Sequence, residues 1–454
     1  MQSFSVAAKR VTVVGAARSG VAAAALLARR GAQVTLTDLR PEIDAAEGLR
    51  NAGVELALGG HPSGVFERAD LIVLSPGVPG SQPLIADARQ RGVPVMGEIE
   101  LASRWLKGKV IAITGTKGKS TTTTLTGRVL QAGGRRAIVG GNIGLPLSAQ
   151  VDASTPETLH VVEVSSFQLE ETDTFHPWIA VLLNLSADHL DRHGTREAYA
   201  AAKARIFANQ AADDWTVVNA DDPAVLALAD RSAARRLPFA MDRAMAEGVS
   251  LVGDTIVRTV NGRQTPLVPV SAVQLPGRHL LADVMAAAAV GSIAGVASPA
   301  MVTAVESFRG LEHAMESVGA VDGVRFINDS KATNIEAARR AIESFDDRVV
   351  VILGGRFKGG SFRDLREAVS GRVAAVVAIG DARPLIRESL SDLVPVRDAT
   401  SMEDAVTQAF AAARPRGVVL LAPACASFDM FVDYADRGRR FKAAVKQLTT
   451  RRQP

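Results

Sequence analysis

The segment Gly-Thr-Lys-Gly-Lys-Ser, residues 115–120, has the residue types of a phosphate-binding loop. It lies between an apolar stretch, 110–113, and a helical pattern that starts around Thr121. Glycines let backbone N–H groups point at phosphate oxygens, and the start of a helix adds partial positive charge. Lys119 is placed to reach a transferring phosphate, and Ser120 to ligate Mg²⁺. The motif indicates a nucleoside triphosphate, although Ile113 stands where the general eight-residue pattern has a glycine.

Three further residues are candidates for the same site. Glu163 closes the apolar stretch 159–164, where a carboxylate could hold Mg²⁺ or could simply start the next helix. His189 follows the stretch 179–185, and its spacing favours a structural histidine. Lys203 lies on a predicted helix, and from spacing alone it is interpreted as a surface lysine whose stem covers apolar neighbours.

A second glycine loop, residues 15–20, follows the first apolar stretch of the chain. It is a weak dinucleotide fingerprint because Ala17 occupies the position of the middle glycine. Asp38, at the end of the next predicted strand, could hold a ribose hydroxyl. A nicotinamide cofactor, another nucleotide or phosphate ligand, and a plain structural turn all remain open.

A third polar loop, residues 327–334, carries six polar groups between a predicted strand and a predicted helix. Helix capping needs only one or two of them, so the surplus favours a ligand-binding loop. Lys358 and Ser427 follow other apolar stretches of the same region, where an anionic substrate could be held.

Apolar stretches alternate with helical patterns along the whole chain, which predicts parallel sheets covered on both faces. The expected fold is α/β with three domains: a Rossmann-like domain (1–100), a central P-loop domain with a mainly parallel sheet (101–309) and a second Rossmann-like domain (310–454). Short alternating segments near 250–270 predict a small hairpin excursion. The uncharged stretch 284–305 predicts two buried helices, with Ser298 capping the second and Pro299 opening it, rather than a membrane span.

Composition narrows the classes of function. The chain has 454 residues, a net charge of +4 and only 4% aromatic residues, which argues against nucleic-acid binding. A single cysteine, Cys425, excludes an intramolecular disulfide and points to a reducing compartment. We therefore expect a cytoplasmic protein without a membrane span.

Several of these blocks occur together, in this order, in the Mur ligases of bacterial peptidoglycan synthesis. The 115–120 loop, Gly-Gly-Asn-Ile-Gly at 140–144, the block 163–170, Asp-His-Leu-Asp-Arg at 188–192, the Lys203 helix and the 328–334 loop all resemble that family. The resemblance covers nearly the whole chain and is strongest to the branch that adds glutamate.

The resemblance implies an ATP-dependent amide ligase that works through an acyl phosphate. Its implied partners are ATP, UDP-N-acetylmuramoyl-L-alanine and glutamate, and a monomer is expected. It resolves the first glycine loop in favour of the UDP substrate. It also implies two Mg²⁺ ions and a carbamylated Lys203, which would reverse the surface interpretation of that lysine.

The residues implied for each role are as follows. Catalysis is assigned to Lys119, Glu163, His189 and Lys203, and the metal ions to Ser120, Glu163, His189 and Lys203. ATP is assigned to Gly115, Thr116, Lys117, Gly118, Lys119, Ser120, Thr121, Asp283, Asp329 and Lys331. The UDP substrate is assigned to Ser19, Asp38, Arg40, Ser75, Pro76, Gly77 and Asn142. Glutamate is assigned to Thr333, Lys358, Ser427, Phe428 and Tyr434.

The chain departs from the family pattern at the nucleotide site. Ala314 stands where an arginine is usual, Leu280 and Asp283 stand where paired asparagines are usual, and Lys117 stands where asparagine is common. We expect Arg309, Arg278 or Lys117 to supply the missing positive charge. The alternatives are another ligase of the superfamily, a nucleotide-binding regulator with slow ATPase activity, and a nicotinamide oxidoreductase.

Overall fold

The computed structural model describes residues 4–186, 190–274, 278–346, 348–357 and 359–450. It divides into two compact units, residues 1–308 and 309–454. The predicted positions His189 and Lys358 lie outside the described residues. The predicted α/β class with three domains and mostly parallel sheets is confirmed.

The chain starts with a five-stranded parallel sheet in the order β3-β2-β1-β4-β5. Apolar β-branched runs form its central strands, and Val13 and Val14 of β1 are fully buried. The strands are β1 Arg10–Val14, β2 Gln33–Asp38, β3 Glu55–Leu58, β4 Leu71–Leu74 and β5 Val95–Gly97. The helices are α1 Arg18–Arg29, α2 Ala46–Asn51, α3 Ser63–Glu67, α4 Pro83–Gln90 and α5 Glu98–Ser103.

The same unit contains a nine-stranded sheet in the order β14-β13-β12-β11-β10-β9-β6-β8-β7. Its parallel part runs from β12 to β7, and β6 leads into the phosphate loop. These strands are β6 Lys109–Thr114, β7 Ala137–Gly141, β8 Leu159–Glu163, β9 Ile179–Leu182, β10 Trp215–Asn219 and β11 Arg235–Ala240. The helices are α6 Lys119–Ala132, α7 Leu147–Gln150, α8 Ser166–Glu170, α9 Leu190–His193, α10 Arg196–Ala204 and α11 Pro223–Ala229.

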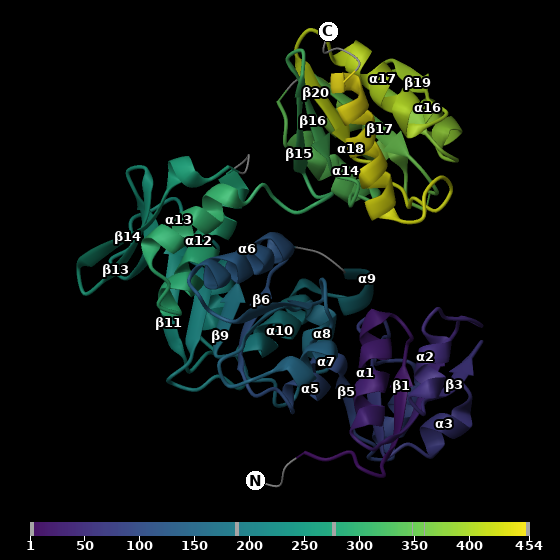
Figure 1. Ribbon diagram of the computed structural model, residues 1–454, viewed down its shortest axis with the longest axis vertical. Helices are drawn as coiled ribbons and strands as arrows, with labels where there is room; N and C mark the ends of the chain where they lie inside the picture. Colours follow the sequence, from purple (N-terminus) through teal and green to yellow (C-terminus); the bar gives the residue numbers. More distant parts are fainter. Residues whose placement is uncertain (1–3, 187–189, 275–277, 347, 358, 451–454) are drawn as a thin grey trace. The chain divides into compact units, whose positions relative to one another are not determined.

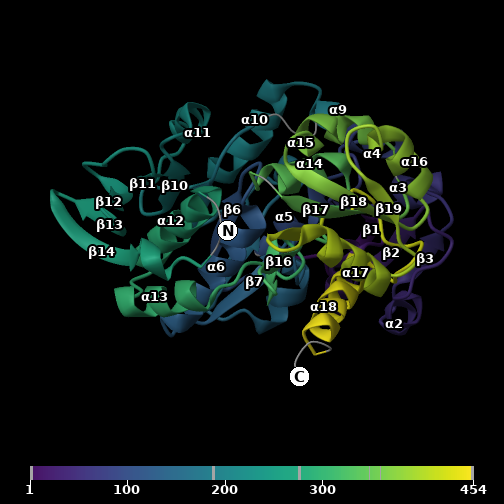
Figure 2. The same ribbon diagram turned by 90° about the horizontal axis from the view of Figure 1, so that it is seen from above.

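The predicted excursion near 250–270 is confirmed as an antiparallel edge of this sheet (Figure 2). It consists of β12 Gly248–Val252, β13 Thr255–Val260 and β14 Arg263–Pro269. Two helices follow, α12 Arg278–Ile293 and α13 Ser298–Ser307, and α12 packs along α6. In the part of the chain that the structure describes, no helix combines the length and apolarity needed to cross a membrane.

The predicted cap of α13 is wrong. Ala297 occupies the N-cap position without a side-chain hydrogen bond, whereas the Ser298 hydroxyl donates to the Leu267 carbonyl at 2.7 Å. Pro299 lies in the first turn of the helix as predicted. The serine therefore ties α13 to β14 instead of capping the helix.

The second unit is a six-stranded sheet in the order β15-β16-β20-β17-β18-β19, in which only β15 is antiparallel. The two core clusters show that helices α14 to α16 cover one face and α17 and α18 the other. Figure 1 shows α14, α16, α17 and α18 around the strands of this sheet. The strands are β15 Glu316–Val321, β16 Val324–Asn328, β17 Val349–Gly354, β18 Val373–Ile379, β19 Val396–Asp398 and β20 Gly417–Leu421. The helices are α14 Ile335–Glu343, α15 Arg366–Val369, α16 Arg383–Leu390, α17 Met402–Ala413 and α18 Tyr434–Thr450.

Candidate active site

The phosphate loop joins the buried end of β6 to the start of α6. Gly118 occupies the N-cap of α6 with φ +78°, a left-handed conformation that favours glycine. A Cβ at this position would lie 2.1 Å from Oδ1 of Asp283. The Lys119 ammonium donates to the Thr116 carbonyl at 2.9 Å, so it lies folded over the loop. The loop therefore has the backbone form that turns N–H groups toward a phosphate.

Asn184 holds the loop through its side chain, although nothing in the sequence pattern singled it out. Its Oδ1 accepts from the Thr116 N–H at 3.1 Å and from the Lys117 N–H at 2.8 Å. Its Nδ2 donates to the Lys117 carbonyl at 3.1 Å. The sequence feature that could have identified Asn184 is its position just after β9, the strand that pairs with β6.

Lys203 contacts the loop from α10. The side chain is buried, and its ammonium donates to the Gly115 carbonyl at 2.8 Å. Tyr199, one turn earlier, lies under the ammonium at 4.7 Å and has its hydroxyl 3.2 Å from Thr116 Oγ1. The interpretation of Lys203 as a surface lysine is therefore wrong, because α10 packs against the phosphate loop.

Glu163 ends β8 directly beside β6, where it is in register with Ile113. Its side chain is buried, and Oε1 accepts from Asn142 Nδ2 at 2.8 Å. Oε2 has no hydrogen-bond partner among the described residues. A buried carboxylate oxygen without a partner is costly and fits a hard cation such as Mg²⁺. No cluster of three or more acidic, histidine or cysteine ligands occurs among the described residues, and His189 is outside them.

Asp283 faces the loop from α12. It is buried, its Oδ2 has no hydrogen-bond partner among the described residues, and burial raises the pKa of its carboxyl to about 8. At neutral pH the carboxyl is therefore largely protonated. A protonated carboxyl, like a side-chain amide, can both donate and accept, although the amide has two N–H donors and the carboxyl a single O–H donor.

The residues implied for the UDP substrate gather at the carboxyl edge of the first sheet. Asp38 ends β2, and its carboxylate accepts from the Ala16 N–H at 2.6 Å and from the Arg40 guanidinium at 2.9 Å. These bonds, led by the one from Arg40, hold the pKa of Asp38 well below its usual range. Ser19 is half-buried in α1, and Pro76 and Gly77 follow β4.

Ser75 is buried between the two loops of this edge. Its Oγ has no hydrogen-bond partner among the described residues, and a Cβ on Gly20 would lie 2.9 Å from it. Arg192, which was not predicted as a site residue, donates to the Pro76 carbonyl at 3.2 Å. Arg18 donates to the Gly144 carbonyl at 3.2 Å, two residues beyond Asn142. The first sheet thus contacts the loops of the central sheet that carry predicted site residues.

In the second unit the predicted residues lie at the ends of neighbouring parallel strands. Asp329, Lys331 and Thr333 follow β16, and Ser427 and Phe428 follow β20. Burial raises the pKa of Asp329 to about 6, and its Oδ1 accepts from the Met315 N–H at 3.2 Å. The structure brings these residues together at one edge of the sheet.

The exposure of the predicted residues differs. Ser427 is buried, whereas Phe428 and Tyr434 are 64% and 42% exposed. Exposed aromatic side chains next to polar loops leave apolar surface available to a ligand. They lie around the start of α18.

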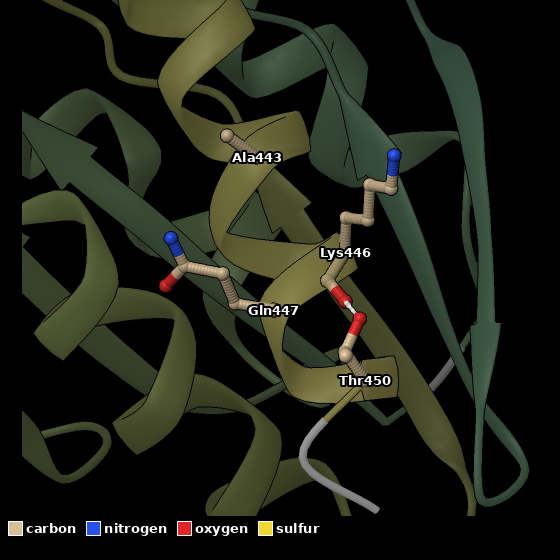
Figure 3. A pocket seen from close by; sticks show the side chains of 4 residues that line it. All are labelled: Ala443, Lys446, Gln447 and Thr450. Carbon is tan, nitrogen blue, oxygen red and sulfur yellow. Dashed lines mark hydrogen bonds between the residues drawn. The ribbon is translucent and has the colours of Figure 1, made fainter. Parts of the chain in front are cut away.

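A hollow of about 450 Å³ lies elsewhere on α18 (Figure 3). Its lining consists of Ala443, Lys446, Gln447 and Thr450, all from the last turns of that one helix. The Thr450 hydroxyl is already bonded to the Lys446 carbonyl. None of the predicted site residues lines this hollow, so it is not the candidate active site.

Comparisons with known proteins match successive parts of the chain to three domains of one family. Residues 9–97 match the Mur ligase MurD-like N-terminal domain, 113–291 the Mur ligase middle domain and 315–425 the Mur ligase glutamate ligase domain. A UDP-N-acetylmuramoylalanine--D-glutamate ligase from Acidobacterium capsulatum is 47% identical over 442 residues, 96% of each chain. The enzyme of that name from Geobacter metallireducens is 45% identical and covers 99% of this chain and 100% of its own.

Among solved structures, UDP-N-acetylmuramate-alanine ligase from Thermotoga maritima superposes with a TM-score of 0.58. The match covers 98% of this chain and 100% of the other at 21% identity. At that identity the comparison supports the arrangement of elements within the fold.

Proposed function

Because this chain belongs to the Mur ligase family, we propose that it is the ATP-dependent ligase that joins D-glutamate to UDP-N-acetylmuramoyl-L-alanine in peptidoglycan synthesis. The observation that carries the proposal is the match over nearly the full chain to relatives of that name. The phosphate loop, held by Asn184 and Lys203, supports it from the geometry.

The chemistry follows from the poor electrophilicity of a carboxylate. The alanyl carboxylate attacks the γ-phosphorus of ATP, the bond from that phosphorus to the bridging oxygen breaks, and ADP leaves. The amine of glutamate then attacks the acyl phosphate through a tetrahedral intermediate, which releases inorganic phosphate and a proton. Lys119 stabilises the charge that develops on the transferring phosphoryl group.

We assign Mg²⁺ to Ser120, Glu163, His189 and Lys203, with two ions expected. The support within the described residues is the unpartnered Oε2 of Glu163. Bound there, Mg²⁺ neutralises charge on the phosphate oxygens. Carbamylation of Lys203 is part of the same proposal, and intact-mass measurement of the purified protein tests it.

The remaining assignments follow the fold. We propose that the carboxyl edge of the first sheet and Asn142 bind the UDP substrate, and that the loops after β16 and β20, Lys358 and Tyr434 bind glutamate. The proposal also includes the domain limits 1–100, 101–309 and 310–454, a monomeric state and a cytoplasmic location.

Arg309, Arg278 or Lys117 supplies the positive charge that the usual arginine would provide at position 314, where this chain has Ala314. Alanine substitution of each residue, followed by measurement of the Michaelis constant for ATP, tests this.

Phosphate release is the decisive assay. We expect release to require ATP, the muramoyl nucleotide and D-glutamate together, and L-glutamate to replace D-glutamate poorly. Release that needs neither the muramoyl nucleotide nor glutamate would instead identify a nucleotide-binding regulator with slow ATPase activity.

Lys119 provides the matching test by mutation. We predict that Lys119→Ala lowers kcat for product formation at least about 100-fold, because the transition state loses the cation proposed to contact the transferring phosphoryl group. The control is Lys107→Ala, because this lysine is exposed and belongs to none of the proposed sites. Full activity of Lys119→Ala would refute the mechanism.

A further inference from the structure

Arg437 is a fully buried cation in α18 of the second unit. Its guanidinium makes three hydrogen bonds, from Nε to Ser330 Oγ at 2.9 Å, from Nη2 to the Ser330 carbonyl at 2.8 Å and from Nη1 to the Cys425 carbonyl at 3.1 Å. Every nitrogen of the fork therefore has a partner, and all of them belong to Ser330 or Cys425.

The charge of this guanidinium has no bonded counter-ion. Among the described residues Arg437 forms no ion pair, its three hydrogen-bond acceptors are neutral oxygens, and the Asp429 carboxylate acts on it only through space. Burial lowers the pKa of Arg437 to about 10, so it stays charged at neutral pH. Burying a cation against neutral acceptors costs free energy, so a guanidinium at this position is explained better by the groups it holds in place than by the space it fills.

The two partners belong to the two loops that carry predicted ligand residues. Ser330 lies between Asp329 and Lys331, and Cys425 lies two residues before Ser427. The Ser330 hydroxyl also donates to the Tyr434 carbonyl at 2.7 Å, which connects the first turn of α18 to the same bonds. A displacement of the guanidinium would move both loops.

We propose that Arg437 is the positioning residue that fixes the 328–334 and 423–428 loops relative to each other for glutamate and ATP. The proposal rests on the assignment of these loops to glutamate under the proposed function. Arg437 acts through Ser330 and Cys425, and its positive charge also favours a dicarboxylate nearby. Lysine cannot replace it, because an ammonium lacks the planar fork that reaches three acceptors at once.

The test uses the full-length protein with Arg437→Lys and Arg437→Met. We expect both variants to raise the Michaelis constant for D-glutamate about tenfold or more and to raise that for ATP, because a misplacement of about 1 Å at a substrate-positioning group is sufficient for such losses. The Michaelis constant for the UDP substrate stays unchanged. Arg440→Lys is the control, since this arginine is on the same helix, is 58% exposed and pairs with Asp436.

The split between Michaelis constants separates positioning from mere stabilisation. A variant that only loses folded protein lowers the apparent kcat and leaves all three Michaelis constants as they were, and that result would overturn the proposal. Where the Arg437 variants fail to fold, Ser330→Ala decides. This substitution removes one acceptor of Arg437 and the donor to the Tyr434 carbonyl. It should raise the Michaelis constant for D-glutamate at least about threefold. An unchanged Michaelis constant refutes the proposal.

Ser427→Ala distinguishes this proposal from the function on which it rests. Suppose that Ser427→Ala raises the Michaelis constant for D-glutamate while the Arg437 and Ser330 variants do not. That result would support the proposed glutamate site and contradict the positioning role of Arg437. If D-glutamate is not a substrate of the unmodified protein, the proposed function itself fails.

Discussion

Gly118 is the residue of the phosphate loop where backbone conformation and space act together. Its φ of +78° is unfavourable for residues with a Cβ. A Cβ there would also lie 2.1 Å from Oδ1 of Asp283. Gly134, just beyond the other end of α6, has a similar φ of +72°, but a Cβ there would have no other atom within 4 Å. The two glycines differ chiefly in the space around them.

We predict that Gly118→Ala raises the Michaelis constant for ATP about tenfold, because the clash with Asp283 displaces the loop. Gly134→Ala should cost only the left-handed strain, about 1 kcal/mol, and leave ATP kinetics unchanged. Thermal unfolding and ATP titration of both variants check this. Equal ATP kinetics in the two variants would contradict the role assigned to the space at Gly118.

The residues of this loop show how far sequence reasoning reaches. Lys119 and Ser120 could be chosen as candidates from the sequence because the roles proposed for them depend on short spacing to glycines. Asn184 and Lys203 could not, because they contact the loop from positions 67 and 88 residues away along the chain. Spacing reports nothing about such contacts, and only the resemblance to a family singled out Lys203.

At the scale of the element, helix α5 carries two buried glutamates, Glu98 and Glu100, whose pKa values are shifted in opposite directions. Glu98 accepts from the Ser148 N–H at 2.6 Å, and burial, which outweighs that bond, raises the pKa of its carboxyl to about 7. Burial also acts to raise the pKa of Glu100, but bonds from the Asp173, Thr174 and Phe175 N–H groups and from Arg104 outweigh it and lower the pKa. The two groups therefore make stability depend on pH with opposite sign.

The predicted consequence for Glu98 follows from linkage. The contribution of Glu98 to the free energy of unfolding is fully present below the unfolded pKa near 4.5 and is lost as pH rises through the folded pKa of about 7. The loss amounts to about 3 kcal/mol. Glu98→Gln should therefore gain stability relative to the unmodified protein as pH rises from 5 to 8. Melting midpoints measured across that range check the trend, and a constant difference between the two proteins would contradict it.

Glu100→Gln is the matched control with the opposite sign. The lowered pKa of Glu100 stabilises the fold above the unfolded pKa and loses that effect as pH falls through the folded one. The substitution should cost at least about 2 kcal/mol at pH 7, because hydrogen bonds to a carboxylate are lost. That deficit should shrink below pH 4.5, in contrast to the behaviour of Glu98→Gln.

Elements were easier to predict than their ends. The apolar runs of β1, β6 and β17 predicted buried parallel strands because both faces of such strands are covered. The start of α13 was mispredicted because Ser298 bonds to Leu267, 31 residues earlier in the chain, and a cap signal cannot reveal such a competing partner.

At the scale of the whole molecule, the chain forms two compact units with their own apolar cores. In the first unit, Leu26 of α1 packs in one cluster with Leu147 and Val151, so the first sheet and the central sheet share part of a core. The second unit has a cluster on each face of its sheet. Separate cores favour two unfolding transitions, one for each unit.

The assignment of ligands to units can be read from these transitions by calorimetry. The residues that we propose for the UDP substrate all lie in 1–308 and those proposed for glutamate in 309–454, whereas residues proposed for ATP occur in both units. A ligand at 100 times its Kd adds about 2.7 kcal/mol to the free energy of unfolding of the unit that binds it. This raises the thermal midpoint of that unit's transition by a few degrees. We predict that the UDP substrate shifts only the first unit's transition, while a non-hydrolysable ATP analogue shifts both. Asp329→Asn should abolish the analogue's effect on the second transition alone, and an unaltered shift would remove Asp329 from the nucleotide site.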